Sequence, residues 1–176
     1  MRVIGGEYRS RLLKTIPGLE TRPTPDRLRE SLFNILAPEI EGVVFVDAYA
    51  GTGAVGIEAL SRGARHAIFL ERGRAAVAVI RENLRTLEAE RRAEVVQGRV
   101  LQYLAHRHGD IVFLDPPYEL AREYTGALEL LAEAPPPLVI VQHSIRFELE
   151  DAYGRMERRR ELKQGDNKLT FYRRRE

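Results

Sequence analysis

The stretch Val46-Asp47-Ala48-Tyr49-Ala50-Gly51-Thr52-Gly53 joins a short apolar run to a helix-like segment. Gly51, Gly53 and Gly56 match the spacing G-x-G-x-x-G, whose glycines permit a tight turn and a close approach of the backbone to a bound nucleotide. Glu71 ends the next apolar run, 20 residues beyond Gly51, where an acid can bind ribose hydroxyls. The stretch therefore predicts a nucleoside-containing cofactor at the carboxyl end of a sheet.

The glycine spacing alone does not separate a nicotinamide dinucleotide from S-adenosylmethionine. Asp47, at the mouth of the loop, favours the second. In a dinucleotide fold the pyrophosphate lies on the N-terminus of the following helix, and a carboxylate at that point would repel it. S-adenosylmethionine has no phosphate and carries a sulfonium and an ammonium group, so Asp47 indicates a cationic ligand.

Outward from this loop, apolar runs of strand length alternate with segments of helix length. The runs lie at 43–46, 67–70, 94–96, 111–114 and 138–141, and the helix-like segments at 55–62, 74–87, 101–106 and 119–132. This alternation predicts a doubly wound, Rossmann-like α/β sheet with mostly parallel strands. Two further runs at 156–162 and 168–173 flank the turn-rich residues 164–167. They predict a closing antiparallel hairpin, which makes seven strands.

The N-terminal residues stand outside this alternation. Gly5 and Gly6 precede the basic alternation 8–11, which predicts a small hairpin or an extended arm. Pro25 then opens a helix-like segment that stops at Pro38. Residues 1–30 carry a net charge of +3 and residues 155–176 a net charge of +5, whereas the chain between them carries −6. Basic ends of this kind favour a polyanionic partner such as nucleic acid.

Composition restricts the class of protein further. The chain has 176 residues, 44% hydrophobic and 31% charged, which is typical of one globular domain. Without a run of ~18 apolar residues or a secretory signal, we expect no membrane association and a cytoplasmic location. The absence of cysteine excludes disulfides, thiolate nucleophiles and sulfur-based zinc sites, and we expect no metal.

A second motif, Asp115-Pro116-Pro117-Tyr118, directly follows the run 111–114. Two prolines fix the backbone, so the Asp115 carboxylate and the Pro116 carbonyl can both face one crevice as acceptors. Two acceptors match an NH2 group and would turn its lone pair toward an electrophile. Tyr118 offers a face on which an extruded base can stack. The motif predicts methyl transfer from a sulfonium to an exocyclic amine.

These residues resemble the signature of methyltransferases that act on exocyclic amines of nucleobases. Together with Ile4-Gly5-Gly6, Arg22-Pro23-Thr24, the run 26–34 and Glu58-Ala59-Leu60-Ser61-Arg62, they resemble the bacterial RsmD family over nearly the whole chain. The resemblance implies a Rossmann-like class I methyltransferase that uses S-adenosylmethionine to methylate N2 of a guanine in 16S rRNA. The substrate would be naked rRNA or a 30S particle, and we expect a monomer.

The resemblance also implies site residues. It places Asp115, Pro116, Pro117 and Tyr118 at the target amine, and it places at the cofactor Asp47, Ala48, Tyr49, Ala50, Gly51, Thr52, Gly53, Glu71, Arg72, Arg99 and Val100. For RNA contacts we predict Arg9, Arg11, Arg22, Thr24, Arg27 and Arg29. Residues 1–24 would form an RNA-contacting arm or hairpin and residues 25–176 the methyltransferase domain.

Two positions depart from the family pattern. Gly98-Arg99-Val100 stands where relatives often have an acidic or amide side chain near the adenine, so only backbone contacts are expected there. Gln142-His143 stands where relatives often have a glutamate, and we assign Gln142 no role. The alternatives are an adenine-N6 methyltransferase, which shares Asp-Pro-Pro-Tyr; a nicotinamide-dependent oxidoreductase, supported by the glycines alone; and a non-catalytic RNA-binding assembly factor.

Overall fold

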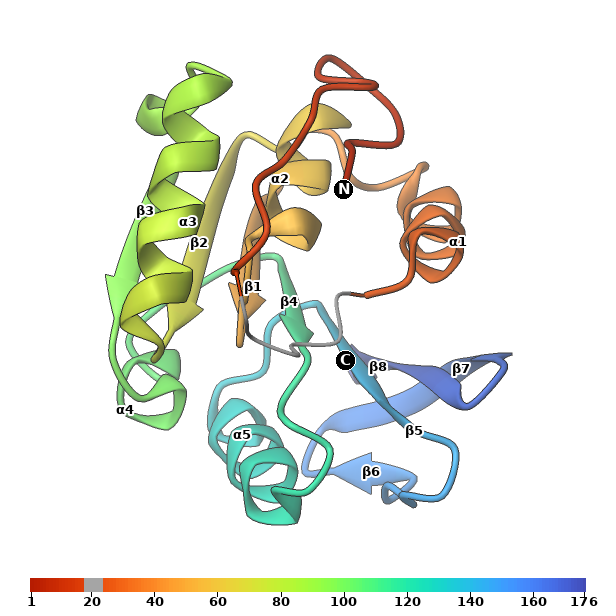
Figure 1. Cartoon of the computed structure of the whole chain (residues 1–176). Helices are drawn as coiled ribbons and strands as arrows, with labels where there is room; N and C mark the ends of the chain where they lie inside the picture. The colour runs from red at the N-terminus through yellow and green to blue at the C-terminus, as the bar shows by residue number, and fades with distance from the viewer. Residues whose placement is uncertain (18–23) are drawn as a thin grey trace.

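The computed structural model describes residues 1–17 and 24–176, which form a single sheet with helices on both faces (Figure 1). The strands are β1 (Val44–Ala48), β2 (His66–Glu71), β3 (Ala93–Gln97), β4 (Ile111–Leu114), β5 (Leu138–Ser144), β6 (Ala152–Tyr153), β7 (Met156–Gln164) and β8 (Asn167–Arg174). The helices are α1 (Asp26–Leu36), α2 (Ala54–Ser61), α3 (Arg74–Thr86), α4 (Val100–Leu104) and α5 (Ala121–Glu133), with a 3-10 turn η1 (Glu90–Arg92). The predicted α/β fold is confirmed.

The strand order is β3-β2-β1-β4-β5-β8-β7-β6. The first five strands in this order are parallel, and β8, β7 and β6 are antiparallel additions. The expected count of seven strands was wrong, because the two-residue β6 pairs with β7 as an eighth strand. A strand of two residues has no periodicity that a sequence pattern could reveal. The order reverses between β1 and β4, and the loops after these two strands therefore open into one crevice.

The parallel strands are buried on both faces, which explains their continuous apolar runs. In β4, Val112 and Leu114 pack with α4 and α5, whereas Ile111 and Phe113 pack on the opposite face with α1 and α2. A third cluster joins the N-terminal residues to α2 and α3. The helix expected after Pro25 is α1, which buries Leu28, Leu32, Phe33 and Leu36. In the described parts of the chain, no helix is long and apolar enough to cross a membrane.

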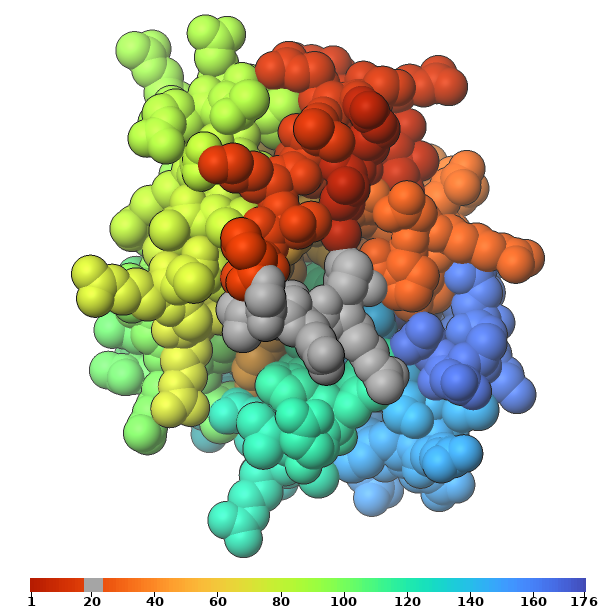
Figure 2. Space-filling view, in the orientation of Figure 1, coloured from red at the N-terminus to blue at the C-terminus, as the bar shows by residue number. Residues whose placement is uncertain are grey.

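The N-terminal residues form a hairpin-like turn that lies on the domain. Arg2 pairs with Leu12 in an antiparallel bridge, and Leu13 N donates to Met1 O at 2.7 Å. Val3 and Leu13 are each 2% exposed because they pack against α2 and α3. Figure 2 shows this segment in red between the yellow-green side chains of α3 and the orange side chains of α1. The N-terminal segment therefore packs on the rest of the domain and does not project from it as a separate arm.

Candidate active site

The two predicted loops lie side by side. Strands β1 and β4 are neighbours with Ala48 opposite Leu114, and Asp115 N donates to Ala48 O at 3.4 Å. The glycine loop continues from Ala48, and the Asp-Pro-Pro-Tyr motif begins at Asp115. The sheet thus brings a predicted cofactor site and a predicted amine site to one edge, as expected for a ligand crevice at a topological switch point.

The glycine loop turns through backbone conformations that favour glycine. Gly51 and Gly53 have φ of +58° and +83°, and α2 begins directly afterwards at Ala54. A Cβ atom built at Gly51 would meet no other atom within 4 Å, so the loop faces open space at that point. Tyr49 also has a positive φ, +63°, which is uncommon for a tyrosine. Its hydroxyl donates to Glu123 Oε2 on α5 at 2.7 Å, a link between the two halves of the crevice that sequence reasoning missed.

Glu71 lies at the end of β2 beside this loop and is half-buried. Its Oε1 accepts the Gly51 amide at 2.8 Å, and its Oε2 accepts the Gly73 amide at 2.6 Å. The carboxylate therefore fixes the loop, while each oxygen keeps lone-pair capacity for a ligand hydroxyl. Arg72 is exposed next to it.

Asp47 has a different position from the one expected. Its side chain is 1% exposed, and its Oδ2 accepts the Gly56 amide, an otherwise unpaired N–H in the first turn of α2, at 2.9 Å. The idea that Asp47 directly meets a cationic ligand at the loop entrance is corrected: the carboxylate points inward and anchors α2. Burial raises its pKa well above the usual range, and the charges of Asp115 and Glu71 raise it further.

The crevice as a whole nevertheless carries the acidic groups that favour a cationic ligand. Asp115 and Glu71 are both close enough to Asp47 for their charges to raise its pKa. Three carboxylates around a glycine loop disfavour a pyrophosphate and favour a cation. These three carboxylates, with the open space at Gly51, fit a sulfonium cofactor that carries a ribose.

The start of α4 supplies the remaining predicted cofactor positions. Gly98 N donates to Glu71 O at 3.0 Å, which holds this turn against β2. Arg99 is exposed at the N-cap of α4, and Val100 is buried in the core. The Val100 side chain is thus committed to packing, so a contact from this residue to an adenine is left to its backbone.

The Asp-Pro-Pro-Tyr loop contains one acceptor that is already partly engaged. Asp115 is half-buried, and burial raises the pKa of its carboxyl to about 7. The carbonyl oxygen of Pro116 accepts the Tyr124 hydroxyl at 3.1 Å, so it offers a target amine one remaining lone pair. Tyr118 is half-buried, and its hydroxyl donates to the Asn167 side chain. Tyr124 was missed in the sequence, where it looks like any core residue of an amphipathic helix.

The comparisons with known proteins agree with this geometry. A family model described as conserved hypothetical protein 95 matches residues 1–173. The Escherichia coli protein named ribosomal RNA small subunit methyltransferase D is 43% identical over 133 residues, which cover 73% of this chain and 67% of the relative. The chain belongs to the RsmD family.

The solved structures agree as well. The Escherichia coli protein yhhF has a TM-score of 0.85 and 36% identity, with 99% of this chain and 98% of that chain covered. An RNA methyltransferase from Salinibacter ruber, determined with S-adenosyl-L-homocysteine, has a TM-score of 0.69 at 16% identity, over 88% of this chain and 95% of that chain, and shares the fold. This RsmD-family chain thus has the class I methyltransferase fold.

The residues predicted to contact RNA fall into three groups in this RsmD-family protein. Arg9, Arg11 and Arg27 are exposed, and Arg22 lies outside the described residues. Thr24 and Arg29 are 7% and 0% exposed and were wrongly assigned to an RNA-facing surface. Thr24 is turned into the crevice, where its hydroxyl donates to Gln142 Oε1 at 3.2 Å and lowers the pKa of the Asp115 carboxyl.

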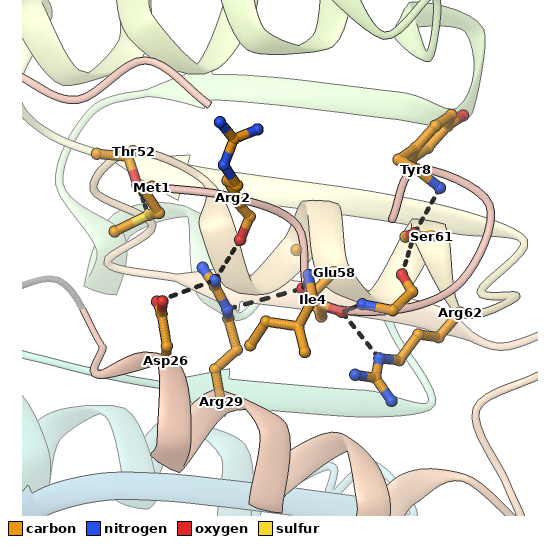
Figure 3. A network of polar contacts seen from close by, with 12 residues as sticks. Met1, Arg2, Ile4, Tyr8, Asp26, Arg29, Thr52, Glu58, Ser61 and Arg62 are labelled. Atoms are coloured by element: carbon orange, nitrogen blue, oxygen red, sulfur yellow. Dashed lines mark hydrogen bonds and ion pairs between the residues drawn. The ribbon is translucent and has the colours of Figure 1, made fainter. Parts of the chain in front are cut away.

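Arg29 belongs to a buried polar network that holds the N-terminal hairpin (Figure 3). Its Nη2 donates to Arg2 O at 2.6 Å, and its guanidinium pairs with Asp26 and with the fully buried Glu58. Glu58 in turn accepts the amides of Ile4 and Gly5, each at 2.9 Å. Arg29 therefore has a structural role, because its charge is paired with groups inside the protein.

Proposed function

We propose that this protein transfers a methyl group from S-adenosylmethionine to the exocyclic N2 amine of a guanine in small-subunit rRNA. The observation that carries the proposal is the position of Asp115, whose backbone amide donates to Ala48 O where the glycine loop begins, with the Pro116 carbonyl next in the chain. The names of the RsmD-family relatives support a ribosomal RNA substrate.

When bound, S-adenosylmethionine supplies an electrophilic methyl group on a sulfonium. The ionised Asp115 and the remaining lone pair of the Pro116 carbonyl would each accept one N–H of the target amine, which leaves the nitrogen lone pair free to attack. Because the pKa of Asp115 is raised to about 7, its carboxylate is also a competent acceptor for the proton that the methylated nitrogen releases.

The target guanine has to leave its base pair, because N2 lies on the paired edge. Tyr118 beside the amine site offers a ring for the extruded base. The exposed Arg9, Arg11 and Arg27 lie on the N-terminal hairpin and α1 and are available for phosphates. We propose that residues 1–24 dock RNA while residues 25–176 carry the reaction, with the protein acting in the cytoplasm as a monomer on 16S rRNA, either naked or within a 30S particle.

The test is methyl transfer from radiolabelled S-adenosylmethionine to unmodified 30S subunits and to naked 16S rRNA, followed by digestion to nucleosides. We expect label in N2-methylguanosine with at least one of the two substrates, and strongly reduced label with Asp115→Ala. Label in N6-methyladenosine would replace this proposal by the adenine alternative. Absence of label from both substrates, with cofactor binding intact, would overturn the proposed activity.

A further inference from the structure

Resting on the proposed function, we propose that Thr24 and Gln142 form a positioning pair that orients the Asp115 carboxylate. Neither side chain would touch the reacting atoms; each would act through Asp115. This proposal assigns a role to Gln142, which departs from the family pattern. It also replaces the RNA contact that the sequence suggested for Thr24.

The first support is burial combined with contact. Thr24 and Gln142 are 7% and 4% exposed, and Thr24 Oγ1 donates to Gln142 Oε1 at 3.2 Å with the amide oriented as in the structure. Leu114 and Val141 are paired on β4 and β5, so the residues that follow them, Asp115 and Gln142, lie side by side. The Thr24 hydroxyl lowers the pKa of the Asp115 carboxyl by hydrogen bonding. Buried polar groups are paired because an unpaired one costs about 1–3 kcal/mol. These contacts therefore link the side chains of Gln142, Thr24 and Asp115 in one row.

The second support comes from counting protons. A threonine hydroxyl has one proton, and a carboxylate has none to give. The charged Asp115 competes more strongly for that proton than a neutral amide oxygen does. If the Gln142 amide is turned with its nitrogen toward Thr24, Gln142 donates to Thr24 and Thr24 donates to Asp115. The two ends of an amide have nearly the same shape, so the turn requires no repacking.

The third support is the charge that surrounds Asp115. Asp47 on β1 and Tyr124 on α5 are the titratable groups that interact electrostatically with Asp115. Burial raises the pKa of Asp115, whereas the Thr24 hydroxyl lowers it. Among these neighbours, Thr24 is the group that favours the ionised Asp115. It also occupies one acceptor site of the carboxylate and leaves others for the target amine.

The pair connects distant parts of the chain. Thr24 precedes α1, and Gln142 lies 118 residues later on β5. The network of Arg29 and Glu58 fixes α1 against α2, so Thr24 enters the crevice from an anchored helix. The segment that carries the RNA-facing arginines thus also supplies a hydrogen-bond donor to the proposed catalytic carboxylate.

The test measures the titration of the Asp115 carboxyl by NMR in the protein without RNA, in wild type, Thr24→Val, Thr24→Ser and Gln142→Glu. We expect the pKa of Asp115 to rise by roughly 1–2 units in Thr24→Val, since the ionised carboxylate loses a hydrogen-bond donor. Thr24→Ser should restore the wild-type value. Gln142→Glu should raise the pKa as well, because a carboxylate cannot donate to Thr24.

Thr170→Val is the matched control. Thr170 is 1% exposed on β8 and its hydroxyl contacts His143 Nε2 at 2.7 Å, so the variant removes a buried hydroxyl near β5 without touching Asp115. The Asp115 titration should not move. Calorimetric binding of S-adenosylmethionine verifies that each variant is folded.

The pH dependence of methyl transfer gives an independent readout. The acid limb of kcat should shift to higher pH in Thr24→Val by the same amount as the NMR titration. An unchanged titration in Thr24→Val would overturn the positioning pair. An unchanged acid limb of kcat in Thr24→Val, together with a higher KM for RNA, would also overturn it and would make Thr24 an RNA contact. Because the NMR titration needs no substrate, its result stands apart from the identity of the methylated base.

Discussion

The Nε atom of Arg29 lies 3.7 Å from Oε1 of Glu58, and both side chains are completely buried. The pair joins α1 to α2, and further hydrogen bonds of both residues reach the N-terminal hairpin. An arginine that looks like part of a basic RNA-binding cluster in the sequence is thereby an internal anchor. Burial lowers its pKa, and the charges of Glu58 and Asp26 oppose that shift.

Arg29→Ala should therefore destabilise the protein by about 3–5 kcal/mol, because it leaves Glu58 buried with less compensation. Chemical denaturation measures the free energy of unfolding. The control Arg27→Ala removes an exposed arginine of the same helix and should change stability by less than ~0.5 kcal/mol. Similar losses in the two variants would contradict the structural role of Arg29.

Asp115→Ala should lower kcat at least ~100-fold, about 2.7 kcal/mol of transition-state stabilisation, by loss of one preorganised acceptor. The affinity for S-adenosylmethionine should change little, because Asp115 faces the amine side of the crevice. Single-turnover methylation and calorimetry separate the two effects. Nearly normal turnover by a folded variant would show that another group holds the amine.

The raised pKa of Asp115 also predicts a pH-dependent stability. Its folded pKa is about 7, above the ~3.9 of an unfolded aspartate, so the folded state binds more protons between about pH 4 and 7. The free energy of unfolding should consequently fall as pH rises through this window. Asp115→Asn stays neutral and should gain stability over wild type at pH 8 but not at pH 4. Equal Tm differences at both pH values would contradict the shift.

Glu71→Ala should weaken S-adenosylmethionine binding about tenfold or more, because charge-assisted hydrogen bonds are worth ~1.5–3 kcal/mol each. The structure adds a second cause: the variant also releases the amides of Gly51 and Gly73. Glu71→Gln keeps an acceptor for one amide and should lie between wild type and Glu71→Ala. An unchanged Kd in calorimetry would move the ribose site away from β2.

Replacing Arg9, Arg11 and Arg27 together with alanine should reduce the salt slope of log RNA affinity by roughly 2–3, at ~0.7–0.9 for each lost phosphate contact. Cofactor affinity should be unaffected. The matched control replaces three arginines of the C-terminal hairpin, Arg159 and Arg175, which pair with Glu157, and Arg173, which pairs with Glu39. A larger loss of slope in this control would move RNA recognition to that hairpin.

The sequence by itself determined the order of strands and helices, the glycine loop and the Asp-Pro-Pro-Tyr motif. Each of these features depends on residues that are close in the chain, so periodicity and loop composition reveal them. β4 was predicted with its observed bounds, Ile111–Leu114, since a strand buried on both faces is a continuous apolar run. The two-residue β6 was missed because no pattern fits in two residues.

Only the tertiary structure decided what the polar side chains do. Asp47 anchors α2, Arg29 pairs with Glu58, and Thr24 reaches Gln142 across 118 residues of sequence. A charged or polar residue has the same appearance in a sequence whether it faces water, RNA or a buried partner. Its role depends on which distant groups the folded sheet brings within hydrogen-bonding distance, and burial then fixes that partner because leaving it unpaired is costly.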